Sequence, residues 1–312
     1  MTAANPSNNA PDRTPRRCRR WLRGVALLSV IFVLLFIYNG TNTSWKTPDF
    51  GVTNIPPDTK HVGELRVLTW NIAKCDACQS NLLFRSTADV RAHLEKIAAV
   101  IRAEQPDLVA LTEINLECGP CPVNQVEHLA RALEMHAWAF GENSSFGVPF
   151  FRIRTGNALL SRLPLRGLEV QQLTRGTPFY YPRNNRRLLW CEVILNGFPL
   201  LAAGLRNDSF NPENNFLQVE QILHKLDGRP AIFAGDFNVR PEQAAMKRWR
   251  NSGLFIGDWA GAPTFPSESP NRRIDEILAP VEWRLVSSRV LNSDLSDHLP
   301  VVSVFEVRKV TR

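Results

Sequence analysis

The stretch RPAIFAGDFNVRPE, residues 229–242, combines an apolar strand pattern with polar residues at its end. Its first half is a short apolar run of the kind found in buried strands, and the run ends at Gly235. Asp236 and Asn238 follow directly, two residues apart. A buried polar side chain is costly unless it has a partner. Two polar residues at the point where a strand leaves the core therefore point to a site at the end of a sheet.

Polar side chains stand in the same position on other predicted strands. Taken singly, each is explained as a turn residue or a helix cap, since Asn and Asp favour turns. Gathered in one place, carboxylates repel one another unless a cation or a proton lies between them. Hard oxygen ligands favour Mg²⁺, Mn²⁺ or Ca²⁺ over zinc. The further members are Asn71 at the end of a strand over 64–72, Glu113 at the end of 106–114, Asp275 within 272–280, and Asp297 with His298 before the closing strand.

The order of the predicted elements indicates the fold class. Residues 87–105 carry apolar side chains at helical spacing and lie between two predicted strands. Asn196 and Gly197 join two apolar runs and form a strong hairpin signal. Helices alternate with strands early in the chain, and hairpins dominate later. We therefore expect an α/β domain over 64–308, in which two mixed β-sheets pack together with helices outside.

The net charge of +7 is concentrated at the N-terminus. Residues 1–40 hold six arginines and a single acidic residue, so only about +2 remains for the rest of the chain. The basic character is therefore poor support for nucleic-acid binding by the domain. A basic and aromatic stretch, YYPRNNRRLLW (180–190), fits either contact with an anionic ligand or a solvated loop.

An apolar run, GVALLSVIFVLLFIY (24–38), follows the arginines. With the residues before it, the run is about long enough to cross a bilayer, which predicts a transmembrane signal-anchor over 22–39. By the positive-inside rule, residues 1–21 are then a cytoplasmic tail and the domain lies outside, behind a polar linker over 40–63. A cleaved signal peptide and a buried core helix are the alternatives.

Six blocks of sequence occur in order along the chain: TWNI (69–72), LTEI (111–114), GNALLSRLPL (156–165), GDFNVRP (235–241), RRIDEIL (272–278) and SDHLPV (296–301). Together they resemble the endonuclease/exonuclease/phosphatase superfamily, which includes pancreatic deoxyribonuclease, apurinic-site endonucleases, inositol polyphosphate 5-phosphatases and neutral sphingomyelinases. The resemblance covers about residues 64–308. It implies a four-layered α/β sandwich with its site at one end of the two sheets.

The resemblance also implies an activity and a set of roles. The activity is phosphoester hydrolysis that depends on Mg²⁺ or Mn²⁺, with phosphodiesters of nucleic acids or phospholipid headgroups as the leading substrates and a monomer as the working unit. Carried over by position, Asp236 activates the attacking water and Asn238 contacts the phosphate; Glu113 and Asn71 hold the metal; Asp297 binds metal or orients a partner; His298 binds the scissile phosphate; and Asp275 pairs with a histidine.

One position departs from the family pattern. The family has a further histidine at the end of the strand before GDFN, and Asp275 would support it. Here that strand ends in GLRND, which places Arg206 at the position. Arginine stays protonated and cannot shuttle a proton, although it can bind a phosphate oxygen or pair with Asp275. An active enzyme that uses Arg206 for phosphate binding, a weakened enzyme, and a family member that acts as a binding module all stay open.

Two CxxC pairs follow the strands of the predicted site. Cys75 and Cys78 come after Asn71, and Cys118 and Cys121 come after Glu113. Because the two strands should be neighbours, we expect the four sulfurs to meet near the site rim. A structural Cys₄ zinc site and two disulfides both fit, the latter because of the predicted external location.

Overall fold

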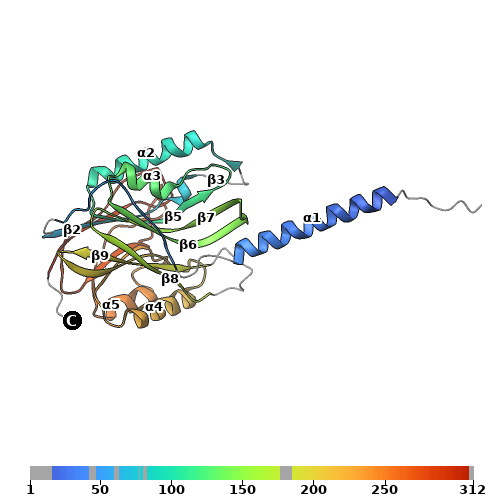
Figure 1. The fold of residues 1–312 in the computed structure, drawn as a ribbon. Coiled ribbons are helices and arrows are strands. Elements are labelled where there is room, and N and C mark those ends of the chain that lie inside the picture. The colour runs from blue at the N-terminus through green and yellow to red at the C-terminus, as the bar shows by residue number, and fades with distance from the viewer. Residues whose placement is uncertain are drawn as a thin grey trace, which may run out of the picture.

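The computed structural model describes residues 16–41, 47–59, 63–76, 78–79, 83–175 and 185–308. Two β-sheets face each other, with helices on both outer sides and the long helix α1 (Arg16–Thr41) projecting from one end (Figure 1). The predicted α/β sandwich of two mixed sheets is therefore confirmed.

The first sheet has seven strands and carries the N-terminal half of the site. Its inner parallel pair, β2 and β5, brings the carboxyl ends of both strands to the same edge. In spatial order the strands are β1 (Asp49–Val52), β6 (Ala137–Val148), β7 (Phe151–Ser161), β5 (Leu108–Cys118), β2 (Glu64–Asn71), β15 (Val301–Glu306) and β14 (Arg284–Val290).

The second sheet has six strands and also contains one parallel pair, β10 with β11. The hairpin between β9 and β10 turns at Asn196 and Gly197, both with positive φ, as the sequence predicts. In spatial order the strands are β12 (Phe255–Ile256), β13 (Asp275–Pro280), β11 (Ala231–Asp236), β10 (Phe198–Arg206), β9 (Arg187–Leu195) and β8 (Leu165–Gln172), and β3 (Cys78–Gln79) with β4 (Leu83–Phe84) forms a separate small ribbon.

Helices close the outer faces. α2 (Thr87–Glu104) and α3 (Gln125–Ala132) cover the seven-stranded sheet, while α4 (Pro212–Leu226) and α5 (Ala244–Asn251) cover the other (Figure 1). The Ser86 hydroxyl caps α2 by accepting from the amide of Asp89. The face of α2 that the sequence marks as apolar, from Val90 to Ile101, is the buried one.

The N-terminal helix projects from the sandwich and touches it at one end, where Phe36 packs against Phe146 of β6. Its residues Arg19–Tyr38 are long and apolar enough to cross a membrane, and a signal sequence would meet the same criterion. The segment 40–63, expected to be a linker, contains strand β1, which pairs with β6 at the sheet edge. The sheet therefore begins before residue 64, and little chain separates it from α1.

Candidate active site

Strand ends supply most of the polar side chains that the sequence singles out, whereas Glu113, predicted to end its strand, lies in the middle of β5. Asp236 is the last residue of β11, and it lies opposite Arg206 of β10 on one side and Asp275 of β13 on the other. Glu113 lies where the register of β5 shifts, with φ of 50°, so a β-bulge turns its side chain toward the site. Two sheets therefore deliver side chains that lie far apart in the sequence to a single place.

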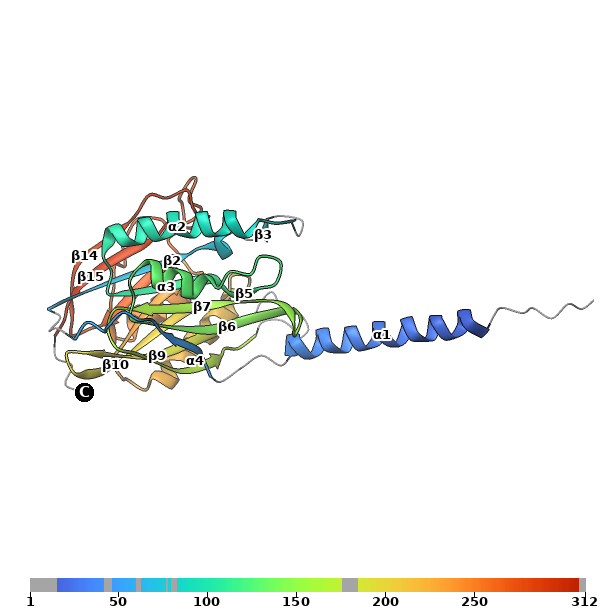
Figure 2. The same ribbon diagram turned by 45° about the horizontal axis from the view of Figure 1, so that its top comes forward.

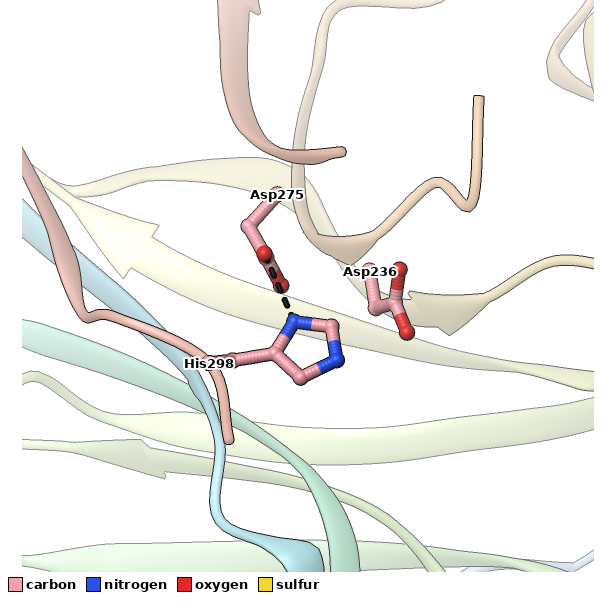
Figure 3. Close-up of side chains that lie close together, drawn as sticks. All are labelled: Asp236, Asp275 and His298. Atoms are coloured by element: carbon pink, nitrogen blue, oxygen red, sulfur yellow. Dashed lines mark hydrogen bonds and ion pairs between the residues drawn. The ribbon is translucent and has the colours of Figure 1, made fainter. Parts of the chain in front are cut away.

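His298 and Asp275 form a buried pair at the centre of the site. The imidazole Nδ1 lies 2.8 Å from the Asp275 carboxylate, and Asp236 lies beside the same ring (Figure 3). Burial lowers the pKa of His298, but Asp275 outweighs it and raises that pKa to about 9. Burial raises the pKa of Asp275 despite the pull of the imidazolium. These shifts favour a proton held between His298 Nδ1 and the Asp275 carboxylate.

The amide of Asn71 links three members of the site. Its Nδ2 lies 3.2 Å from Glu113 Oε1, 3.3 Å from Asp236 Oδ2 and 3.3 Å from His298 Nε2. Its Oδ1 accepts from the amide of Ala73 at 3.1 Å. Asn71 therefore fixes the spacing between the carboxylates of the two sheets.

Two protein cations bind the carboxylate of Glu113. Lys74 Nζ and Arg206 Nη2 each lie 2.5 Å from its oxygens, and Arg206 Nε lies 3.5 Å from Asp236. Burial would raise the pKa of Glu113, but Arg206 and Lys74 hold it well below its usual range. Lys74 reaches Glu113 from a turn in which Ala73, Lys74 and Cys75 all have positive φ. Strained backbone of this kind is common at functional sites.

Asn238 and Asp297 complete the rim. The Asn238 amide donates to Asp236 Oδ1 at 3.0 Å, and its side chain donates to the carbonyl of Asn207 at 3.0 Å. Asp297 lines a cavity of about 440 Å³, which is also lined by Asp236 and His298. The predicted site residues are thus brought together, with Arg206 paired to Glu113 and Asp236 in place of Asp275.

Arg186 and Lys74 are site residues that the sequence motifs do not reveal. Arg186 is buried, donates to Ser209 Oγ at 3.1 Å, and has no carboxylate within ion-pair distance among the described residues. Burial and then Arg206 lower its pKa to about 10. Together with Lys74 and Arg206 it lines a second cavity, of about 210 Å³, that adjoins Glu113. The basic stretch 180–190 is the only sequence signal for Arg186, and Lys74 has none beyond its nearness to Asn71.

The cysteines lie behind the site. Cys118 and Cys121 are buried with their sulfurs 3.1 Å apart, which is longer than the about 2.05 Å of a disulfide bond. Cys75 is buried in the same core cluster. The side chain of Cys78 lies outside the described residues, so the choice between a zinc site and disulfides stays a prediction.

The site has the donor chemistry for a divalent metal. Among the described side chains, one group of ligand atoms lies close enough together to hold an ion, namely Asp236, Asp275 and His298. The carboxylate of Glu113 and the side chain of Asn71 stand next to this group, with Asn71 turning its Nδ2 toward the carboxylates and its Oδ1 toward the amide of Ala73. These donors suit a hard cation. An ion that binds Glu113 must compete with Lys74 and Arg206 for the same two oxygens.

The sequence matches the Endonuclease/Exonuclease/phosphatase family over residues 68–298. This match covers most of the chain, and every site residue, from Asn71 to His298, lies within it. The chain belongs to this family. Family members are phosphoesterases and are generally dependent on divalent metals, and the expected family membership is confirmed.

Solved structures with the same fold support the assignment. An endonuclease/exonuclease/phosphatase from Beutenbergia cavernae is 26% identical, with a TM-score of 0.62, and the match covers 79% of this chain and 72% of that one. The mannosyl-6-phosphatase of Bacteroides thetaiotaomicron is 17% identical, with a TM-score of 0.59 and coverages of 77% and 99%. D. rerio TDP2 complexed with single strand DNA product is 18% identical, with a TM-score of 0.54 and coverages of 79% and 100%. A comparison with curated protein sequences found no match.

Proposed function

We propose that this family member is a divalent-metal-dependent phosphoesterase, tethered to a membrane by α1, that hydrolyses phosphodiesters in preference to phosphomonoesters. It works as a monomer, with its basic tail in the cytoplasm and its domain outside. The observation that carries the proposal is the buried pair of His298 and Asp275, 2.8 Å apart, next to the buried carboxylate of Asp236. A proton acceptor thus stands beside a group that stabilises negative charge.

The proposed chemistry assigns a task to each of these groups. Asp236, held by the amides of Asn238 and Asn71, accepts a proton from the attacking water. His298 donates to a phosphate oxygen and stabilises the charge that develops there. A Mg²⁺ or Mn²⁺ ion held by Glu113, Asn71 and Asp297 would, when bound, supply further charge stabilisation. Asp275 keeps the imidazole of His298 oriented and protonated.

Arg206 and Arg186 add a binding function. Arg206 stands where the family has a histidine, and it points to the same cavity as Asp236. Arg186 is a buried cation without an ion-pair partner among the described residues, a state that an anionic ligand would relieve. We assign both guanidinium groups to phosphate oxygens of the substrate, because arginine binds such oxygens in bidentate fashion.

A second candidate function follows from the ion pairs of Glu113. Since Arg206 and Lys74 already neutralise this carboxylate, the site would also suit a catalytically impaired member that binds phosphate-bearing ligands. One named relative is a mannosyl-6-phosphatase and another holds a single-strand DNA product, so they support phosphoester recognition without choosing its class.

Hydrolysis by the full chain in detergent tests the proposal. The substrates are bis-p-nitrophenyl phosphate, plasmid DNA, single-stranded RNA, sphingomyelin and an inositol phosphate, each with Mg²⁺ or Mn²⁺. We expect activity that is lost with a chelator and in Asp236→Asn. The matched control is Asp227→Asn, an exposed helix cap with positive φ, where asparagine is well tolerated. Folded protein without activity on any substrate would favour the binding module.

A further inference from the structure

The chain enters the sandwich at a defined end. Strand β1 runs antiparallel to β6, with Asp49 opposite Phe140. Since β6 continues past Phe140 to the β6–β7 hairpin, β1 begins at the end of the sandwich that carries this hairpin. The ring of Phe36 in α1 meets that of Phe146 in β6 edge-on, with 5.0 Å between centroids. Figures 1 and 2 both show α1 leaving from this end.

The candidate active site lies at the same end. β5 passes Glu113 halfway along its length and continues to Cys118, which pairs with Ile153 of β7. That pair is close to the turn, where Val148 lies opposite Phe151. At about 3.4 Å per residue, the hairpin extends roughly 17 Å beyond Glu113. The site therefore opens on the end of the sandwich from which α1 projects.

The hairpin carries a cluster of exposed phenylalanines. Phe146, Phe150 and Phe151 are 55%, 80% and 53% exposed. Exposed apolar side chains are normal when scattered, but three within the six residues 146–151 of one hairpin indicate an interaction surface. Aromatic residues beside a membrane-crossing helix suit the layer of lipid headgroups.

We propose that the hairpin 146–151 inserts into the surface of the bilayer that α1 crosses, so that the active-site end faces the lipid and the substrates are phosphoesters carried by membrane lipids. The proposal rests on the proposed function, both the tether and the hydrolysis. Only residues 42–48 separate α1 from β1. Even fully extended, they reach roughly 25 Å. A tether this short, attached at this end, keeps the hairpin near the membrane.

The opposite end of the domain provides a matched control. Phe198 lies at the β9–β10 turn and is 64% exposed, but β10 runs from it toward Arg206, so it stands at the end away from the site. Phe150 and Phe198 are thus two exposed phenylalanines at hairpin turns that differ in the end of the sandwich they occupy.

The orientation is tested in the full chain, reconstituted in nanodiscs that contain a spin-labelled phosphatidylcholine. A genetically encoded fluorescent amino acid is placed at Phe150 or at Phe198. We expect lipid quenching at least about threefold stronger at position 150. Equal quenching, or stronger quenching at 198, overturns the proposal. This readout needs no hydrolysis, so it decides the orientation even if the proposed activity fails.

The substrate class is tested by comparing a vesicle-borne lipid phosphoester with its water-soluble headgroup. We expect the wild-type chain to prefer the vesicle, and Phe150→Ser to lower this preference at least about fivefold, with Phe198→Ser close to wild type. A preference for the soluble headgroup or for nucleic acid, unchanged in Phe150→Ser, overturns the lipid assignment. Absence of hydrolysis on all substrates contradicts the proposed function instead.

Discussion

Asparagine in place of Asp275 should release His298 from its buried ion pair and move its titration. A pKa of about 9 in place of an ordinary 6.5 corresponds to roughly 3 kcal/mol in favour of the protonated ring. Asparagine keeps the size of the side chain but removes the charge, while burial of the ring continues to lower its pKa. We therefore expect His298 in Asp275→Asn to titrate well below 9, with Asp236 and Asp297 as the remaining charges that oppose burial.

The sign of the effect on stability follows from the raised pKa. The native protein binds a proton at His298 that the unfolded chain releases near pH 6.5, so the pair stabilises the fold fully below that pH and loses this contribution as the pH rises through about 9. Asp275→Asn should thus lower the free energy of unfolding by up to roughly 3 kcal/mol at pH 6, and much less at pH 9.5.

Nuclear magnetic resonance of the ring protons of His298, in full-length protein in detergent micelles, measures the titration directly. Asp297→Asn serves as the control, since Asp297 is the weakest of the charges that raise the pKa of His298. A midpoint that stays near 9 in folded Asp275→Asn would refute the assignment of Asp275 as the cause. Hydrolysis at pH 8 should fall along with the protonated fraction.

Other substitutions test separate parts of the site. Arg206→His restores the family residue; we expect weaker binding of inorganic phosphate by calorimetry, and turnover that rises if Arg206 impairs the enzyme or falls if it binds substrate. Arg186→Met should weaken phosphate binding about tenfold, a loss of roughly 1.4 kcal/mol, whereas Arg166→Met, which removes a surface charge paired elsewhere, should not. Gly235→Ala would place a Cβ 2.0 Å from the carbonyl oxygen of Leu205, so we expect thermal unfolding to occur at least several degrees lower, and an unchanged melting temperature would contradict the packing.

Much of the fold can be predicted from the sequence, because helix periodicity and turn residues are local sequence signals. The apolar spacing of 87–105 predicts α2 and its buried face, and Asn196 with Gly197 predicts the β9–β10 turn. The sequence does not predict strand β1, because it has only four residues, lies at the edge of the sheet and is half exposed, so it carries no periodic signal of its own.

Some features of the site can likewise be predicted from the sequence, and others depend on the tertiary structure. Spacing and motif identify Asn71, Asp236 and His298, because the first two end recognisable apolar strands and the third directly precedes one. The pairing of Arg206 does not follow from its position in the sequence: register places it opposite Asp236, and the bulge at Glu113 brings a second carboxylate within 2.5 Å. Lys74 joins them only because a turn with positive φ aims it at Glu113.

The sequence by itself thus determined the fold class, the family and the side chains able to do phosphoester chemistry, since periodicity and short motifs are properties of neighbouring residues. Tertiary structure alone decided which charges meet, that Asp275 holds His298 while Arg206 holds Glu113, and that the site opens on the end where α1 and the phenylalanine hairpin lie. These depend on strand register and direction, and Coulomb interactions act through space across residues that the sequence places far apart.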